Sequence, residues 1–331
     1  MSPTIHDNPR TGTYTYPRDQ DRISRRCWAR HKDRAEKQIL IPNRGVQKMK
    51  EEALPTIDDL RKSPEEFLSR LKAIKGHELY RVLLGVQNEL TTGCIVRFLA
   101  SNEKWKRSRM VLDLGCGPGD LVAKLSGCFI DKLYTGVDLN EDFIATAKQQ
   151  TKMLSNCTFY QDDIYTFSQG QYNFIILMAV LQHLKIDKFL KHLPFLLDDE
   201  GVVLFFDTTK ENSIEAHPPL VTFNKFCRRF ELMQKLFGVN RNCMAELESK
   251  LGAHNFKIIE DQKQIIPITT TVERLQVVQY LLLFCTVAKK MLWIPINFNK
   301  ILTELLQWYD TPDSRMHLKL QLLLIEKAQS R

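Results

Sequence analysis

Three glycines at alternate positions follow a short apolar segment and predict a ligand-binding loop. Gly115, Gly117 and Gly119 come directly after residues 111–114, which have the composition of a buried parallel strand. Because glycine has no Cβ, a ligand can approach the backbone closely at the tip of such a strand. A dinucleotide-binding fingerprint needs glycines at the first, third and sixth positions, and the sixth position here is Asp120. The spacing therefore favours a nucleoside cofactor other than a nicotinamide dinucleotide.

An acidic residue ends the next predicted strand, at residues 133–138. Asp138 lies 23 residues beyond Gly115, and its carboxylate can accept two hydrogen bonds from the vicinal hydroxyls of a ribose. The alternative is that Asp138 caps the helix predicted over 141–154, but Asn140 is better placed for that role. We therefore predict that Asp138 binds a ribose.

With these residues in view, the segment 111–119 resembles motif I of the class I S-adenosylmethionine (SAM)-dependent methyltransferases. It matches the pattern apolar-apolar-Asp-apolar-Gly-x-Gly-x-Gly at every position. The resemblance implies that Asp113 lies beneath the cofactor and anchors its ammonium group. The loop residues implied as cofactor contacts are Gly115, Cys116, Gly117 and Gly119. A thiol beside a helix amino terminus can also be a nucleophile, but relatives often carry cysteine at this variable position.

The resemblance also implies an adenine-binding pair after the third predicted strand, residues 157–160. In the family an acid at this place accepts from the adenine amine, and the next backbone N–H reaches a ring nitrogen. This assigns the two contacts to Asp163 and Ile164, with Asp162 as the alternative acid; both acids can also be read as solvated loop residues. Two apolar residues at strand ends complete the expected cofactor contacts, Leu139 and Met178.

The segment after the fourth predicted strand, residues 179–184, resembles the Val-Leu-x-His-apolar segment of small-molecule, lipid and quinone methyltransferases. His183 is the candidate general base, since an unperturbed histidine titrates near neutral pH; the alternative is a structural histidine that braces the following helix. Asp207, at the end of the fifth strand, is a candidate for positioning the acceptor, as is His217. The Asn/Asp-Pro-Pro-aromatic motif of many amino-methyltransferases is absent, which counts against exocyclic nucleic-acid amines as acceptors.

Apolar runs alternate with helical patterns from residue 110 onward, which predicts an α/β fold with a parallel sheet. We expect a Rossmann-like, seven-stranded, mostly parallel sheet with helices on both faces. The predicted strands are 110–114, 133–138, 157–160, 173–178, 202–207, 256–260 and about 277–287. The predicted helices between them are 119–127, 141–154, 186–196 and 243–252. As in the resembling family, the last two strands form an edge pair, and the final strand is antiparallel and ends at basic residues, here Lys289 and Lys290.

The chain divides into four predicted parts. Residues 1–45 read as a basic, disordered arm, and residues 46–109 as a helical region. Residues 110–290 form the methyltransferase-like domain, in which 208–242 is an insertion on the substrate side. Its phenylalanines and methionine at helical spacing form either helix core or a lid over an apolar pocket. Residues 291–331 form a helical extension with two periodic segments, 298–309 and 314–328.

Composition and charge restrict the classes of function. The chain has 331 residues, 44% hydrophobic content and a formal net charge of +8, and its first 50 residues hold 12 Lys or Arg against five acids. No apolar run is long enough to span a bilayer, and the amino terminus has no signal-peptide pattern, so we expect a cytoplasmic protein. The eight cysteines lack CxxC pairs, which favours reduced thiols over disulfides or a metal site.

These observations predict a SAM-dependent methyltransferase that transfers a methyl group by direct displacement to a small-molecule or lipid-like acceptor. One alternative is methylation of RNA or protein, because the basic segment at 18–37 can neutralise phosphates. A second alternative is a non-catalytic SAM-binding scaffold. The sequence specifies neither the acceptor atom nor the oligomeric state.

Overall fold

The computed structural model describes residues 54–208, 214–236, 238–292 and 294–328, which belong to one compact unit. The basic arm predicted over 1–45 and the first part of the predicted helical region, 46–53, lie outside the described residues. From residue 54 this region is helical. Its helices are α3 (Ile57–Lys62), α4 (Pro64–Ala73), α5 (Gly76–Ser101) and α6 (Glu103–Arg107).

Five parallel strands form the sheet that carries the predicted motifs. They are β1 (Met110–Leu114), β2 (Leu133–Asp138), β3 (Cys157–Gln161), β4 (Tyr172–Met178) and β5 (Leu197–Thr208). Their spatial order is β3-β2-β1-β4-β5, so β1 and β4 are neighbours although two strands separate them in sequence. In open α/β sheets ligands bind at the carboxyl ends of the strands where the strand order reverses, which here is between β1 and β4. The sequence prediction for these five strands is confirmed.

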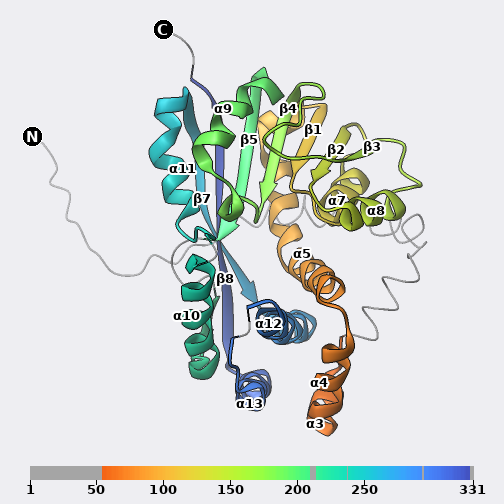
Figure 1. Ribbon diagram of the computed structural model, residues 1–331, viewed down its shortest axis with the longest axis vertical. Helices are drawn as coiled ribbons and strands as arrows, with labels where there is room; N and C mark the ends of the chain where they lie inside the picture. The colour runs from red at the N-terminus through yellow and green to blue at the C-terminus, as the bar shows by residue number, and fades with distance from the viewer. Residues whose placement is uncertain (1–53, 209–213, 237, 293, 329–331) are drawn as a thin grey trace, which may run out of the picture. The chain divides into compact units, whose positions relative to one another are not determined.

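Three antiparallel strands complete the sheet within the described residues, so it has eight strands and not the predicted seven. They are β6 (Ile214–His217), β7 (Phe256–Ile268) and β8 (Arg315–Lys327). β8 pairs with β5 and then with β6, and it pairs with β7 over nearly its whole length. Figure 1 shows β8 continuing well beyond the end of β5.

The strand predicted at 277–287 is wrong, because this segment lies in a helix, α12 (Thr271–Leu292). Val277, Leu281 and Cys285 are fully buried, together with most of their neighbours on other faces of the helix. A helix that is covered on all sides has no polar stripe, so its sequence looks like a buried strand. Among the described residues no helix is long and apolar enough to cross a membrane, α12 included.

The predicted C-terminal extension is half helical. The first periodic segment is α13 (Phe298–Asp310), as expected, but the helix predicted at 314–328 is wrong because this segment is β8. Met316, Leu318 and Leu320 alternate with polar residues at the start of β8, the period of a strand with one buried face. The antiparallel strand that the family resemblance implies therefore exists, but it lies beyond residue 290.

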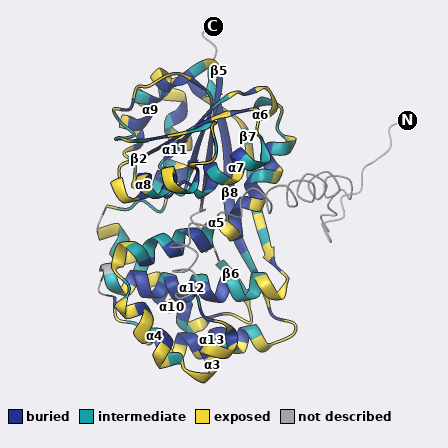
Figure 2. Cartoon of the chain, turned by 90° about the vertical axis from the view of Figure 1, so that its right-hand side faces the viewer, coloured by how far each residue is buried: buried dark blue, intermediate teal, exposed yellow. Residues whose placement is uncertain are grey.

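Helices cover both faces of the sheet, as predicted. One face packs against α5, α6, α7 (Asp120–Cys128) and α8 (Glu141–Gln150), and the other against α9 (Ile186–Leu196) and α11 (Cys243–Leu251). Successive strand residues alternate between the two cores, so Leu204 faces the first and Phe205 the second. Figure 2 shows the sheet strands buried between these layers.

A further core lies where β6, β7 and β8 extend past the parallel strands. It contains the insertion helix α10 (Val221–Leu236), α12, α13, the first part of α5, α3 and α4. Phe223 and Phe226 of α10 are buried in it, and Phe230 packs against it. The insertion predicted at 208–242 thus supplies both a short strand and a helix next to the carboxyl ends of β4 and β5.

Candidate active site

The glycine loop and Asp138 are hydrogen-bonded to each other. Gly117 N–H donates to Asp138 Oδ2 at 2.9 Å, and Asn140 N–H donates to Asp138 Oδ1 at 2.9 Å. Asn140 caps α8 through its own side chain, which accepts from Phe143 N–H, so Asp138 is not the helix cap. The carboxylate therefore faces the loop, and each oxygen keeps lone-pair capacity for a further donor.

The glycine loop needs glycine for two different reasons. Gly115, Gly117 and Gly119 all have positive φ angles, of 76°, 54° and 82°. A Cβ on Gly119 would lie 2.7 Å from Ala147 Cβ, so this position also requires close packing against α8. A Cβ on Gly117 would meet only Leu84 at 3.9 Å. The backbone at Gly117 is therefore the part of the loop that remains open to a ligand.

Two groups under this loop are shifted toward their neutral forms. Burial, and then the negative charge of Asp138, raise the pKa of Asp113 to about 7. Burial, followed by the charges of Asp113 and Asp138, raises the pKa of the Cys116 thiol well above its ordinary value. A nucleophilic role for Cys116 requires a thiolate, so this environment opposes it. A cation bound beside the Asp113 carboxyl would favour its charged form.

The predicted adenine side of the crevice follows β2 and β3. Leu139 is 69% exposed beside Asp138, an uncovered apolar surface at the strand tip. Asp162 Oδ1 accepts from Asp163 N–H at 2.7 Å, and Asp163 Oδ1 accepts from Tyr165 N–H at 2.9 Å, so both acids cap the turn that contains Ile164. Asp162 N–H also donates to Asp138 O at 3.1 Å. The predicted ribose and adenine residues therefore lie side by side.

The segment after β4 contacts the glycine loop from the other side. Met178 ends β4, and Ala179 follows with a positive φ of 56°, an unusual conformation for a residue with a Cβ. Ala179 N–H donates to Phe206 O at 2.8 Å, which fixes this turn to β5. The side chain of Val180 lies directly against Gly115. Residues 178–180 therefore form a wall between the glycine loop and the space beyond it.

That space is a cavity of about 310 Å³. Its walls come from α5, from the turn after β4, and from α10 and α12, including Leu84, Ala179, Phe230 and Phe284. Leu84 also lies nearest to Gly117, and the charge of Asp138 contributes to the raised pKa of Tyr80, another residue of the cavity wall. The cavity therefore adjoins the glycine loop, and we refer to it as the acceptor pocket.

His183 and Asp207 both line the acceptor pocket, so the structure brings the two catalytic candidates together. His183 ends a short 3₁₀ helix, η1 (Leu181–His183), and is exposed. Desolvation, and then the positive charge of Arg241, lower the pKa of His183 below its ordinary value. Asp207 is 2% exposed at the end of β5. The alternative residue His217 lies on β6 and lines a separate hollow with Arg315.

Several pocket residues were not found by sequence reasoning. Arg241 lies between α10 and α11 and donates through Nη1 to Gln182 Oε1 at 3.2 Å. Tyr80 comes from the N-terminal helical region. Tyr280 and Phe284 come from α12, a segment for which the sequence analysis predicts an edge strand. Gln182 precedes His183 in the segment 179–184, and this position next to a catalytic candidate is the only sequence signal for it.

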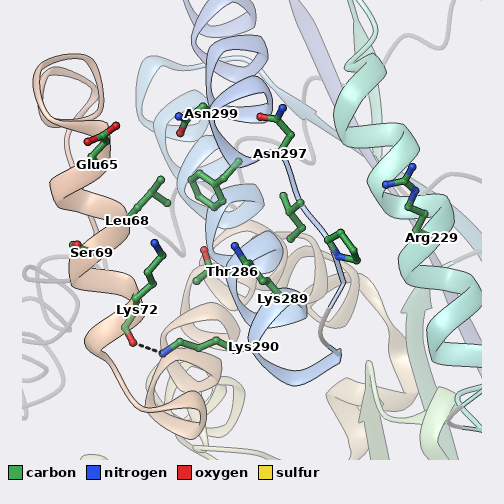
Figure 3. A pocket seen from close by; sticks show the side chains of 13 residues that line it. Glu65, Leu68, Ser69, Lys72, Arg229, Thr286, Lys289, Lys290, Asn297 and Asn299 are labelled. Atoms are coloured by element: carbon green, nitrogen blue, oxygen red, sulfur yellow. Dashed lines mark hydrogen bonds between the residues drawn. The ribbon is translucent and has the colours of Figure 1, made fainter.

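A larger hollow, of about 1110 Å³, lies among α4, α12 and the start of α13 (Figure 3). Lys72, Lys289 and Asn297 line it, and Lys290 Nζ donates to Lys72 O at 2.8 Å. None of the residues predicted from the sequence to bind cofactor or act in catalysis lines this hollow. The two catalytic candidates, His183 and Asp207, line the smaller acceptor pocket instead.

The described residues contain no group of three or more His, Cys, Asp or Glu side chains that could hold a metal ion. The seven cysteines in the described part of the chain are free thiols.

Comparison with known proteins agrees with the motifs. Residues 111–201 match the methyltransferase domain family. The chain is similar to malonyl-[acyl-carrier protein] O-methyltransferase of Bacillus anthracis, with 32% identity over 109 residues, which cover 32% of this chain and 40% of that protein. It is also similar to the mitochondrial ubiquinone biosynthesis O-methyltransferase of Saccharomyces cerevisiae, with 32% identity over 108 residues, 31% of this chain and 35% of that protein.

These similarities are confined to part of each relative. The chain spans 40% or less of the length of the curated relatives named here. Among solved structures it resembles an O-methyltransferase from a polyketide synthase multienzyme of Brevibacillus brevis, with a TM-score of 0.45, 15% identity, and coverage of 83% of this chain and 80% of that one. Motif I, the strand order around it and the family match show that residues 111–201 form a methyltransferase domain of the class I SAM-dependent type, whose cofactor is S-adenosylmethionine.

Proposed function

We propose that this protein transfers a methyl group from SAM to a small-molecule or lipid-like acceptor bound in the acceptor pocket. The observation that carries the proposal is the position of this pocket, which shares Leu84 and the turn at Ala179 with the surroundings of the glycine loop. An acceptor in the pocket is therefore next to the methionine half of a cofactor in the loop. Aromatic side chains of α10 and α12 wall the pocket, which favours a small acceptor over a macromolecule.

The residues around the crevice fit the three parts of the cofactor. We assign the ribose hydroxyls to Asp138, the adenine to Leu139, Asp163 and Ile164, and the methionine moiety to the backbone of Gly115, Cys116 and Gly117. The buried Asp113 receives the ammonium, directly or through water. Gly119 packs the loop on α8, and Met178 contributes apolar surface from the end of β4. The support for this assignment is that all these residues lie at the carboxyl ends of adjacent strands.

The chemistry requires a positioned acceptor and a site for its proton. When bound, SAM supplies a methyl group on a sulfonium; the bond to the acceptor forms as the carbon–sulfur bond breaks, and the electron pair stays on sulfur in S-adenosylhomocysteine. His183 is neutral at neutral pH, because its pKa is lowered, and accepts the acceptor's proton. Asp207, which lines the same pocket, positions the acceptor. The walls of α5, α10 and α12 exclude water from the reacting atoms.

Isothermal titration of the full chain with S-adenosylhomocysteine tests the cofactor assignment. We expect Asp138→Asn to weaken binding by at least about tenfold, since it removes a charged acceptor of two hydrogen bonds. Asp142→Asn is the matched control, because Asp142 is an exposed acid four residues further on, in α8. Equal affinities of the parent and the Asp138→Asn variant would refute the ribose assignment.

Label transfer from methyl-labelled SAM tests the reaction class. Incubation with fractionated cell extract should place label in small molecules or lipids, whereas label in RNA or protein would overturn the proposed acceptor class. Tight cofactor binding without any transfer would favour a binding scaffold.

A further inference from the structure

Arg241 is held in the wall of the acceptor pocket by contacts with η1. Its Nη1 donates to Gln182 Oε1 at 3.2 Å, and the N–H of the preceding residue, Asn240, donates to Gln182 O at 3.0 Å. Gln182 therefore fixes both the backbone and the side chain of the segment before α11. The side chain of Arg241 is thus held at one point and the backbone beside it at another, which reduces the freedom of the guanidinium before any ligand binds.

The guanidinium of Arg241 is a positive charge that the pocket does not neutralise with a close ion pair. Among the described residues, no carboxylate lies within salt-bridge distance of it. Its charge acts on groups from several elements. It contributes to the lowered pKa of His183. Burial raises the pKa of Tyr280 to about 12, and the charge of Arg241 acts in the opposite direction. Burial raises the pKa of Cys227 on α10 and of Cys243 on α11, and the charge of Arg241 acts against both increases. The charge therefore projects into the space that these elements share.

Aromatic rings form part of the pocket wall near this charge, which the acids Asp207 and Glu231 also line. The rings of Phe230 and Phe284 meet edge to face with centroids 4.7 Å apart, and Tyr280 stacks on Phe284 at 6.4 Å. An arginine beside apolar walls loses part of its hydration, so a ligand anion there forms a stronger hydrogen bond than it would in open water. Planar aromatic walls favour a flat apolar ligand body.

We propose that the acceptor is a hydroxylated, planar carboxylic acid, whose carboxylate is bound by Arg241 and whose hydroxyl faces His183. This inference rests on the proposed methyl-transfer function and adds the chemical class of the acceptor. One guanidinium matches the single charge and two oxygens of a carboxylate. A phosphate dianion has more charge than this one arginine can balance. A hydroxyl acceptor needs the proton acceptor that His183 offers, whereas an ionised carboxylate does not.

Binding of matched acid and amide probes tests the inference. The probes are 4-hydroxybenzoate, 4-hydroxyphenylacetate and 4-hydroxycinnamate, each with its neutral amide, titrated into the full chain that is saturated with S-adenosylhomocysteine. We expect at least one acid to bind about tenfold or more tightly than its amide, as a charge-assisted bidentate pair implies. Arg241→Gln should abolish this preference, and Arg241→Lys should keep part of it. Arg228→Gln, which removes an exposed arginine of α10, should leave it unchanged.

The outcomes separate the inference from the proposed function. The inference is overturned if the amides bind as tightly as the acids, if no acid binds, or if Arg241→Gln retains the preference for acids. If Arg241→Gln does not fold, the test compares the parent with Arg241→Lys. The ratio of acid affinity to amide affinity should then be smaller in the Arg241→Lys protein, and an equal ratio overturns the inference. S-adenosylhomocysteine should bind the parent and all folded variants equally, because Arg241 lies outside the cofactor crevice. Failure of the parent to bind S-adenosylhomocysteine would instead overturn the proposed function.

Discussion

Asp113 combines complete burial with a neighbouring negative charge, and this gives the protein a pH-dependent stability. Its pKa is about 7 in the folded chain, whereas an ordinary aspartate has a pKa of 3.8. The folded state therefore holds the proton more tightly, so the free energy of unfolding decreases as pH rises from about 4 through 7. Between pH 5 and 8 the decrease attributable to Asp113 is about 2–3 kcal/mol.

We expect Asp113→Asn to remove this decrease. Urea unfolding at pH 5 and pH 8 should show that the parent loses about 2–3 kcal/mol more than the variant over this interval. Asp142→Asn, at an exposed position, should follow the parent. Parallel pH profiles for the parent and Asp113→Asn would show that Asp113 does not titrate in this range.

His183 should set the acidic side of the activity profile. Because its pKa is lowered, kcat/KM for the acceptor should be flat near neutral pH and fall only below the ordinary histidine pKa, where the ring becomes protonated. His183→Gln should reduce kcat by about 10²–10⁴-fold and remove the acidic decline. Arg241→Gln removes a positive charge near the ring and should shift the decline to higher pH. A decline that stays in place in His183→Gln would assign it to another group.

The residues assigned to the cofactor are more predictable from sequence than those of the acceptor pocket. Gly115, Gly117 and Asp138 lie at strand ends in a fixed spacing, because their roles depend on the backbone path. Arg241 and Tyr80 reach the pocket only through the packing of α5, α10 and α11, and no local pattern marks them. Gln182 has a visible neighbour in His183, but its contact with Arg241 spans 59 residues of sequence.

At the scale of elements, α12 supplies Tyr280 and Phe284 to the wall of the acceptor pocket and is buried over most of its length. Leu281 is 0% exposed within it, whereas Val272, near its start, is 65% exposed. Leu281→Ala should lower the free energy of unfolding by about 2–5 kcal/mol, because it removes buried methyl groups and leaves a cavity. Val272→Ala should change it by about 0.5 kcal/mol or less. Chemical denaturation followed by circular dichroism measures both, and equal effects would contradict the burial of this face.

The two misassigned elements, α12 and β8, fail for the same physical reason. Both are covered on nearly all sides, so their polarity does not repeat with a helical or strand period over their full length. Segment length does not distinguish a helix from a strand here, since β8 has 13 residues and is longer than an ordinary strand. Leu322 to Ile325 form an unbroken apolar run that reads equally well as either structure. Only the pairing of β8 with β5 and β7 resolves the ambiguity.

For the whole molecule, β8 makes the C-terminal segment part of the methyltransferase fold. We expect a fragment limited to residues 110–290, the domain boundary predicted from sequence, to show no cooperative thermal unfolding, because β5 and β7 lose their common partner. A fragment of residues 54–328 should unfold cooperatively and bind S-adenosylhomocysteine. Circular dichroism melts and isothermal titration measure the two properties. Cooperative unfolding of the shorter fragment would show that β8 is dispensable.

The position of β8 between β5 and β7 also has a consequence for biosynthesis. β5 ends at residue 208 and β8 at residue 327, so 119 further residues are translated before the partner of β5 is complete. At about 5–20 residues per second, this takes roughly 6–24 s. During that time the nascent chain presents an apolar strand edge to which other chains can pair. Chaperone dependence of the newly made protein should therefore be governed by this delay more than by the stability of the finished fold.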